Sequence, residues 1–517
     1  MDFFWEQLNI LSVAFYVFLV PVAVLYFTLA KKFSFQWIVL LCVSVFFYFA
    51  NGGIAGFWIF VPLAVTYSAA FACQNGKRPF LAALTVVFNI LFLVFFKELN
   101  FFIRIFDKIL SALSVPQIGE VCFEAPFGIS YISLMLTSYF LDVFWGVCPL
   151  QKNPLRFASS VIFFPITTSG PIARYSQMKE SLFEPHAFQY QEFCFGLERI
   201  LWGFMKKMVI ADRLALLVGF AYADKSLTGT PVLLGLFLFT FQLYFDFSGC
   251  MDIVIGLGEA LGIKIPENFM QPFFSESLSE IWRRWHATLG NWARDYILYP
   301  FLKSGSVQSL GTSLKSSLGK KNFWAKNIPT WLGMFIVWFC MGFWHGGSWN
   351  YIFGSGLFFF AMITAGQILD HFLEKVPFFA KISGLDGMKI FRRIRTTALF
   401  AASISFDRAP SLTEGFLMWK RAFVPSADYF WKSFVPSGFL AADFWVLSVF
   451  VPLVFFVERY EFFSQASNDN TASFRKMLSK KNVIIRHVFF LLILLSVVIF
   501  GMYGPEFDAK GFIYGGF

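Results

Sequence analysis

Two histidines are the residues best suited to chemistry in this sequence, and each lies in a tryptophan-rich phrase. His345 is set in GFWHGGSWN, and no Asp, Glu, Lys or Arg accompanies it between Trp331 and Ile368. An ionisable group at membrane depth is destabilising, so an imidazole in such a block indicates a functional site. A neutral histidine that donates one N–H to a neighbouring helix would explain it equally well, and from this block alone both interpretations stand.

The second histidine, His286, lies in SESLSEIWRRWHATLGNWARDYILYP. Ser277 or Ser279 can cap a helix that begins here, with Glu280 as the capping-box partner of Ser277. At 100° per residue, aromatic and aliphatic residues share one face and an arginine stripe runs beside it. The face holds Trp282, Trp285, Leu289, Trp292 and Tyr296; the stripe holds Arg283, Gly290 and Arg294. We predict one continuous interfacial helix with His286 on the border between face and stripe.

The arginines of this helix suggest an anion site. Arg283, Arg284 and Arg294 would meet the phosphates of a cytosolic acyl donor, because a guanidinium fork matches phosphate geometry. Trp285 and Asn291, on the same segment, are further candidate donor contacts. The alternative is an anchor helix whose arginines bind lipid headgroups, which is the usual meaning of such a pattern.

Two carboxylates interrupt the apolar run at about 231–262. Asp246 and Asp252 lie in QLYFDFSGCMDIVIGLG. Acidic residues in such a segment form ion or catalytic sites, or they pair with nearby basic groups. We favour structural pairing for Asp252 and leave both readings open for Asp246.

Composition places the chain among polytopic membrane proteins. Of its 517 residues 57% are hydrophobic and 14% are charged, and lipid permits few spanning structures other than helices, so the fold class expected is all-α. The net charge of +10 falls in short loops between apolar runs. We assign it to membrane topology rather than to nucleic acid. The seven cysteines are scattered without metal-ligand spacing, so no metal site is expected.

The apolar runs lie at about 10–30, 36–50, 56–73, 80–96, 127–147, 190–220, 231–262, 396–406, 440–457 and 488–503, besides the block around His345. The acidic start MDFFWEQLN lacks the basic region of a signal peptide. Basic loops assigned to the inside then predict that both termini lie outside the membrane. We expect one polytopic domain over 1–503, followed by an extracytoplasmic tail, 504–517.

Three segments depart from the simple alternation of spans and loops. Residues 98–113 mix charges with Phe and Ile at helical spacing, which predicts an interfacial amphipathic helix. Residues 156–175 are apolar but interrupted by Pro165, Gly170 and Pro171, which predicts a re-entrant segment. Residues 303–326 are polar, basic and rich in Ser and Gly, which predicts a flexible cytoplasmic loop.

Taken together, three phrases resemble the membrane-bound O-acyltransferase superfamily, and most closely its bacterial branch of alginate and peptidoglycan O-acetyltransferases and teichoic-acid D-alanyl transfer proteins. They are YFDFSGCMDIVIGLGEALGIKIPENF, then SESLSEIWRRWHATLGNWARDYILYP, then MGFWHGGSWNYIFGSG. This ordered series covers about 242–356 and is far more specific than a lone histidine.

The resemblance implies a ring of transmembrane helices around a funnel and tunnel, through which an acyl group passes from a cytosolic thioester to an acceptor outside. It implies that His345 is the essential catalytic residue and that His286 is the second histidine, near the cytoplasmic entrance. A buried histidine acting as general base would take the proton from an attacking hydroxyl. The donor implied is acetyl-CoA, or alternatively a phosphopantetheine-linked carrier protein, and no bound cofactor is expected.

The last six residues, Phe512–Phe517, resemble the F-x-[IV]-Y-x-x-F terminal motif of the same branch. The resemblance implies that Tyr514 accepts the acyl group and passes it to an SGNH-type extracytoplasmic partner, which acylates an envelope polysaccharide. Gly515 and Gly516 stand where relatives carry bulky residues. The alternative for Tyr514 is an interfacial anchor.

Two rival functions stay open. One is D-alanyl transfer from a carrier protein to teichoic acid, although the fused tail and the length of the chain favour acetyl. The other is a proton-coupled transporter or polysaccharide exporter that uses His345, Asp246 and Asp252; the internal repeats typical of transporters are not found in the sequence.

Overall fold

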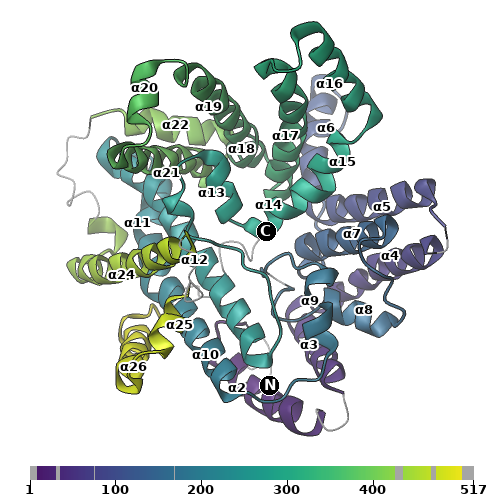
Figure 1. Cartoon of the computed structure of the whole chain (residues 1–517), viewed down its shortest axis with the longest axis vertical. Coiled ribbons are helices and arrows are strands. Elements are labelled where there is room, and N and C mark those ends of the chain that lie inside the picture. The colour runs from purple at the N-terminus through teal and green to yellow at the C-terminus, as the bar shows by residue number, and fades with distance from the viewer. Residues whose placement is uncertain are drawn as a thin grey trace. The chain divides into compact units, whose positions relative to one another are not determined.

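The computed structural model describes residues 9–30, 35–74, 76–167, 169–425, 435–466 and 473–503. Within these ranges the secondary structure is helical, with no strand (Figure 1). Seven helical segments in them are long and apolar enough to cross a membrane. The predicted all-α, polytopic membrane fold is therefore confirmed.

Contacts divide the chain into two compact units, and each is described by itself. Unit 1 comprises Met1–Phe204, Cys250–Glu267 and Tyr503–Phe517; unit 2 comprises Met205–Gly249 and Asn268–Met502. The 32-residue helix α12, Thr230–Leu261, supplies residues to both units. It covers the apolar run predicted at 231–262.

In unit 1 the predicted apolar runs are helices. They are α2 (Val13–Leu25), η1 (Tyr26–Ala30), α3 (Gln36–Gly52), η2 (Ile54–Ile59), α4 (Phe60–Cys73), α5 (Pro79–Lys97), α6 (Leu99–Ala112), α7 (Ile129–Trp145), α8 (Pro154–Val161), α9 (Tyr175–Phe183) and α10 (Tyr190–Phe204). Two candidate spans, Ile54–Cys73 and Pro79–Lys97, lie in this unit. The amphipathic helix predicted at 98–113 is α6, whose Arg104 pairs with Glu120 at 3.1 Å on the exposed side.

The break predicted within 156–175 is confirmed. Helix α8 ends at Val161, and the described backbone between it and Tyr175 of α9, residues 162–167 and 169–174, is non-helical and largely buried. Gly128, at the start of α7, has φ +69°, and a Cβ there would lie 2.1 Å from the carbonyl oxygen of Thr167. A side chain at position 128 would therefore separate α7 from this buried segment. Re-entry of 156–175 into the membrane stays a prediction.

Unit 2 holds most of the remaining helices. They are η3 (Met205–Ala211), α11 (Asp212–Ala223), η4 (Pro272–Phe274), α13 (Leu278–Arg284), α14 (Ala287–Ala293), η5 (Arg294–Leu298), α15 (Tyr299–Leu302), α16 (Gly305–Leu318), α17 (Phe323–His345), α18 (Trp349–Tyr351), η6 (Ile352–Phe358), α19 (Phe359–Leu373), α20 (Pro377–Ile382), α21 (Asp386–Arg408), α22 (Leu412–Ala422), η7 (Val435–Ser437), α24 (Ala441–Ala466), α25 (Phe474–Ser479) and α26 (Val483–Phe500). Candidate spans besides α12 are Phe323–His345, Trp349–Leu373, Ala441–Gln465 and Val483–Phe500. The block around His345 is thus two spans, with His345 at the end of the first.

The prediction of a flexible loop at 303–326 is wrong for most of this segment, because residues 305–318 form helix α16. The helix packs against α17, with Val307 and Gly311 buried. Gly311 lies close to Pro329 of α17, since a Cβ on it would be 3.7 Å from the proline ring. Packing against a neighbour therefore overrides the low helix propensity of this Ser- and Gly-rich segment.

The end of α26 is fastened to η3, a π-helix. The amide of Met502 donates to the carbonyl of Met208 at 3.2 Å, and the Arg213 guanidinium donates to the carbonyl of Phe500. Arg213 also pairs with Asp443 of α24 at 2.9 Å. The last described turn of unit 2 is therefore held in place by backbone and charged contacts.

Candidate active site

The helix predicted from Ser277 onward is interrupted at His286. Ser277 caps α13 as expected, accepting from the amide of Glu280 at 3.2 Å. Helix α13 then ends at Arg284, Trp285 is extended, and His286 adopts a left-handed conformation with φ 47° and ψ 46° before α14 begins. The prediction of one continuous helix is wrong, because a turn of opposite hand separates two seven-residue helices.

The break changes the surroundings of the aromatic residues. The predicted face is almost fully buried within unit 2: Trp282, Trp285, Leu289, Trp292 and Tyr296. The ring of Trp285 lies 4.9 Å from that of Phe400, 5.2 Å from that of Phe269 and 5.7 Å from that of Tyr244. Trp285 is therefore a core residue that holds the turn in position.

Asn268 holds the imidazole of His286. The His286 Nδ1 atom lies 3.0 Å from the Asn268 Oδ1 atom. The centroid of the imidazole ring lies 4.9 Å from that of the Phe247 ring, and the two ring planes are at 89° to each other, an edge-to-face arrangement. His286 is fully buried. Phe247 and Asn268 come from two separate chain segments of unit 2, so the imidazole is oriented by long-range packing.

Trp344 links the two histidines. Its ring centroid lies 6.3 Å from that of His286 and 5.2 Å from that of His345, the last residue of α17. His345 is 3% exposed. Burial lowers the pKa of His286 well below its usual range, and the charge of His345 lowers it further. The structure therefore brings together the two histidines predicted from the sequence, with His286 neutral at physiological pH.

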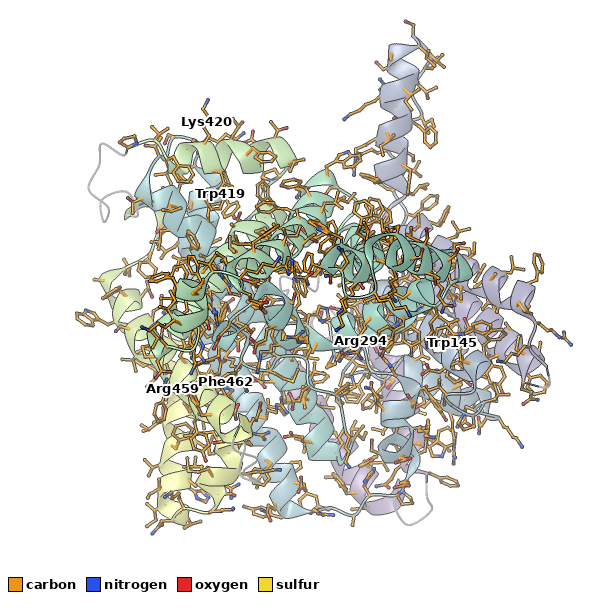
Figure 2. The ribbon with its side chains drawn as sticks, turned by 45° about the horizontal axis from the view of Figure 1, so that its top comes forward. Trp145, Arg294, Trp419, Lys420, Arg459 and Phe462 are labelled. Carbon is orange, nitrogen blue, oxygen red and sulfur yellow. The ribbon has the colours of Figure 1, made fainter. Side chains whose placement is uncertain are left out.

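The three arginines do not share one site. Arg284 pairs with Glu280 at 3.1 Å and lies 4.8 Å over the ring of Phe462. Arg294 pairs with Asp295 at 2.8 Å, which raises the pKa of its guanidinium, and Figure 2 shows it well apart from Phe462.

Arg283 is exposed, as is Asn291 on α14. Because Arg284 and Arg294 are directed to different partners, a phosphate cluster that uses all three arginines would need rearrangement.

Both candidate aspartates have basic partners. Asp252 accepts from Arg199 at 3.0 Å, and the same guanidinium pairs with Glu259 at 3.1 Å and Glu267 at 2.6 Å, all within unit 1. The structural pairing predicted for Asp252 is confirmed.

Asp246, in unit 2, pairs with Lys207 at 2.5 Å, and Lys207 also contacts Asp212 at 2.9 Å. This geometry favours the structural reading that the sequence left open for Asp246.

Asn268 is the site residue that sequence reasoning missed. It lies 18 positions before His286, in a phrase that the sequence analysis used only for the family resemblance, and no local spacing connects the two residues.

Tyr514 lies outside the described residues. Within the described ranges, no group of three His, Cys, Asp or Glu side chains is arranged to hold a metal ion.

Comparisons with known proteins add the family context. Residues 151–319 match the model of the membrane-bound O-acyltransferase family. The chain is 32% identical to the probable alginate O-acetylase of Pseudomonas aeruginosa over 304 residues, which are 59% of this chain and 54% of that protein. It is 28% identical to the peptidoglycan O-acetyltransferase of Helicobacter pylori over 381 residues, 66% of each chain.

A third relative is the teichoic acid D-alanyltransferase of Bacillus subtilis, 29% identical over 257 residues, 48% of this chain and 60% of that protein. The chain spans about half the length of the alginate relatives that it matches.

Proposed function

We propose that this chain, which matches the model of the membrane-bound O-acyltransferase family over residues 151–319, transfers an acetyl group from a cytosolic thioester to a hydroxyl of an extracytoplasmic envelope polysaccharide. The observation that carries the proposal is that Trp344, the residue before His345, lies with its ring centroid 6.3 Å from that of the buried His286, and that the charge of His345 acts on the His286 imidazole. Two buried imidazoles suit proton transfer to and from oxygen.

His345 acts as general base in the proposed reaction. Its imidazole takes the proton of the attacking hydroxyl, the oxygen forms a bond to the thioester carbonyl carbon, and the carbon–sulfur bond breaks. The imidazolium then returns the proton to the departing thiolate, so the products are an acyl ester and a free thiol. Burial of the site keeps water from competing for the thioester.

The attacking hydroxyl of the first transfer is assigned to Tyr514. Its phenol receives the acyl group, and an SGNH-type extracytoplasmic partner moves that group to the polysaccharide. The donor assigned is acetyl-CoA, whose phosphates would meet exposed basic groups such as Arg283. The setting is the inner membrane, with both termini outside.

The experiment is transfer of labelled acetyl from acetyl-CoA by purified protein in lipid, with the partner present. We expect His345→Ala to lower the rate by about 10³-fold or more, since a general base alone supplies about 10²- to 10⁴-fold. His371→Ala is the matched control, because His371 lies at the end of α19, stacked on Phe323 at 4.0 Å. Full transfer by His345→Ala would refute the mechanism.

The tail assignment has its own test. We expect Tyr514→Phe to abolish labelling of the polysaccharide while donor binding persists, because only the hydroxyl is removed. Tyr503→Phe serves as control, since Tyr503 is the last residue of the described part and lies outside the motif. Wild-type transfer by Tyr514→Phe would remove the tail from the reaction.

The D-alanyl alternative is supported by the relative named teichoic acid D-alanyltransferase. Supplying acetyl-CoA and a D-alanyl-charged carrier protein side by side separates the two donors. A strict requirement for the charged carrier would replace acetyl with D-alanyl in the proposal.

A further inference from the structure

Asn268 makes several polar contacts with the turn at His286. Its Oδ1 atom lies 2.8 Å from the Thr288 hydroxyl, 3.2 Å from the Thr288 amide and 3.0 Å from His286 Nδ1. Its backbone carbonyl accepts from the amide of Ala287 at 2.9 Å. Asn268 is fully buried. One residue therefore contacts all three residues that follow Trp285.

These contacts determine which end of the amide faces the turn. A backbone N–H only donates, so the atom of Asn268 that faces the Thr288 amide must be the oxygen. Turning the amide over would set its NH₂ group against that N–H, leaving two buried donors opposed. The Nδ2 group, on the other side, has no acceptor among the described residues. The orientation of Asn268 is therefore fixed by Thr288.

The orientation of Asn268 determines the protonation of His286. Because the amide oxygen accepts, the Nδ1 atom at 3.0 Å must donate and therefore carries the proton. A neutral imidazole has one protonated nitrogen, so Nε2 holds the lone pair. Burial favours the neutral ring by lowering the pKa of His286.

We propose that Asn268 is a positioning residue that fixes His286 as its Nδ1–H tautomer, so that Nε2 is the basic atom offered to the acyl-transfer site. Asn268 acts through the imidazole and its left-handed turn. This assignment rests on the proposed function for the statement that His286 takes part in transfer, but the tautomer itself does not depend on it.

The groups around His286 make the tautomer sensitive to position 268. Phe247 and Trp344 present uncharged rings, and Asn268 and Thr288 present neutral polar groups. His345 is the titratable group whose charge acts on His286. A carboxylate introduced at position 268 would therefore be a new negative charge in direct contact with Nδ1–H, and it would favour the imidazolium.

The test combines spectroscopy with a pH–rate profile on the full-length protein in lipid. Nitrogen-15 NMR of histidine-labelled protein, with His286 assigned by the loss of its signals in His286→Asn, reports which ring nitrogen is protonated. We expect a protonated Nδ1 and an unprotonated Nε2 in the wild type. A protonated Nε2 in the neutral ring would overturn the proposal, whether or not transfer is observed.

Three variants separate positioning from folding. Asn268→Asp keeps the shape and all three acceptor contacts, and we expect the acidic limb of the rate profile to move up by about one pH unit or more, because the imidazolium is stabilised. Asn268→Ala should lose at least about tenfold in rate and give a mixture of tautomers.

Asn350→Ala is the control, since Asn350 is also buried and donates to the carbonyls of Phe406 and Ala409. It should lower thermal stability and leave the tautomer and the profile unchanged. An unmoved limb in folded Asn268→Asp would overturn the proposal. Absence of acyl transfer from every donor would instead refute the proposed function. The NMR measurement would still show which ring nitrogen of His286 is protonated.

Discussion

The Arg199 cluster of unit 1 and the histidine site of unit 2 bury polar groups in opposite ways. In the first, one guanidinium faces three carboxylates, so each charged group has a partner of opposite charge. In the second, His286 meets an uncharged amide oxygen and two aromatic rings, and the charge that acts on it is that of another titratable imidazole, His345. A cluster of fixed charges holds helices together, whereas an imidazole among neutral groups can change its protonation during a reaction.

The largest effect that would sharpen this comparison is the loss of Arg199. We expect Arg199→Ala to destabilise the protein by about 3–5 kcal/mol, because Asp252 and its neighbours lose their buried counter-charge. Thermal unfolding in detergent measures this. The acyl-transfer rate per folded molecule should be retained, since Arg199 itself pairs with Asp252, Glu259 and Glu267 and not with either imidazole assigned to chemistry.

The matched control is Arg104→Ala. Arg104 pairs with Glu120 at 3.1 Å, but both side chains are about half exposed, at 52% and 59%. Exposed pairs contribute about 0–1 kcal/mol. If the two variants unfold at the same temperature, the Arg199 cluster is not a structural clamp and the comparison fails.

A smaller effect is expected at Asp246. Asp246→Asn keeps the shape and removes one charge from the Lys207 network, and Lys207 still pairs with Asp212 at 2.9 Å. We expect a loss of about 1–3 kcal/mol, typical of a weakened buried hydrogen bond, with little change in transfer. Proton-coupled solute uptake that disappears in this variant, without any acyl transfer in the wild type, would instead favour the transporter.

The smallest effect concerns pH. Because the folded state lowers the pKa of His286 below 6.5, the unfolded chain binds more protons than the folded protein between the two values. The contribution of His286 to the free energy of unfolding is therefore fully present above about pH 6.5, and it decreases as the pH falls below that value. We expect His286→Asn, which cannot titrate, to flatten the decline in melting temperature below pH 6.5. An unchanged slope would contradict a neutral buried His286.

Features set by local sequence were predicted well. The Ser277 cap, the extent of α12 and the amphipathic α6 follow from side-chain chemistry and periodicity within a few turns. His345 was singled out because an ionisable group is destabilising in an apolar block, and His286 because of its place on the arginine-bearing segment and the family resemblance; the ring of Trp344, next to His345, lies 6.3 Å from that of His286.

Features set by distant partners were not predicted. The left-handed turn at His286 depends on Asn268, which lies 18 residues earlier, and helix periodicity predicted a straight continuation. The prediction that Arg283, Gly290 and Arg294 form one stripe assumed a continuous helix. The interruption at His286 therefore makes that prediction wrong as well. Arg199 meets Asp252 across 53 residues, and the sequence could indicate only that a basic partner was needed.

The hydrogen bond from Met502 to η3 fixes the point from which the chain continues to Tyr514. Tyr514 follows Met502 by 12 residues, and at about 3.5 Å per residue the Cα atoms of the two residues are at most about 42 Å apart. This distance exceeds the hydrocarbon thickness of a bilayer, about 30 Å. By covalent length alone, the segment proposed to carry the acyl group is therefore long enough to span the hydrocarbon layer from Met502.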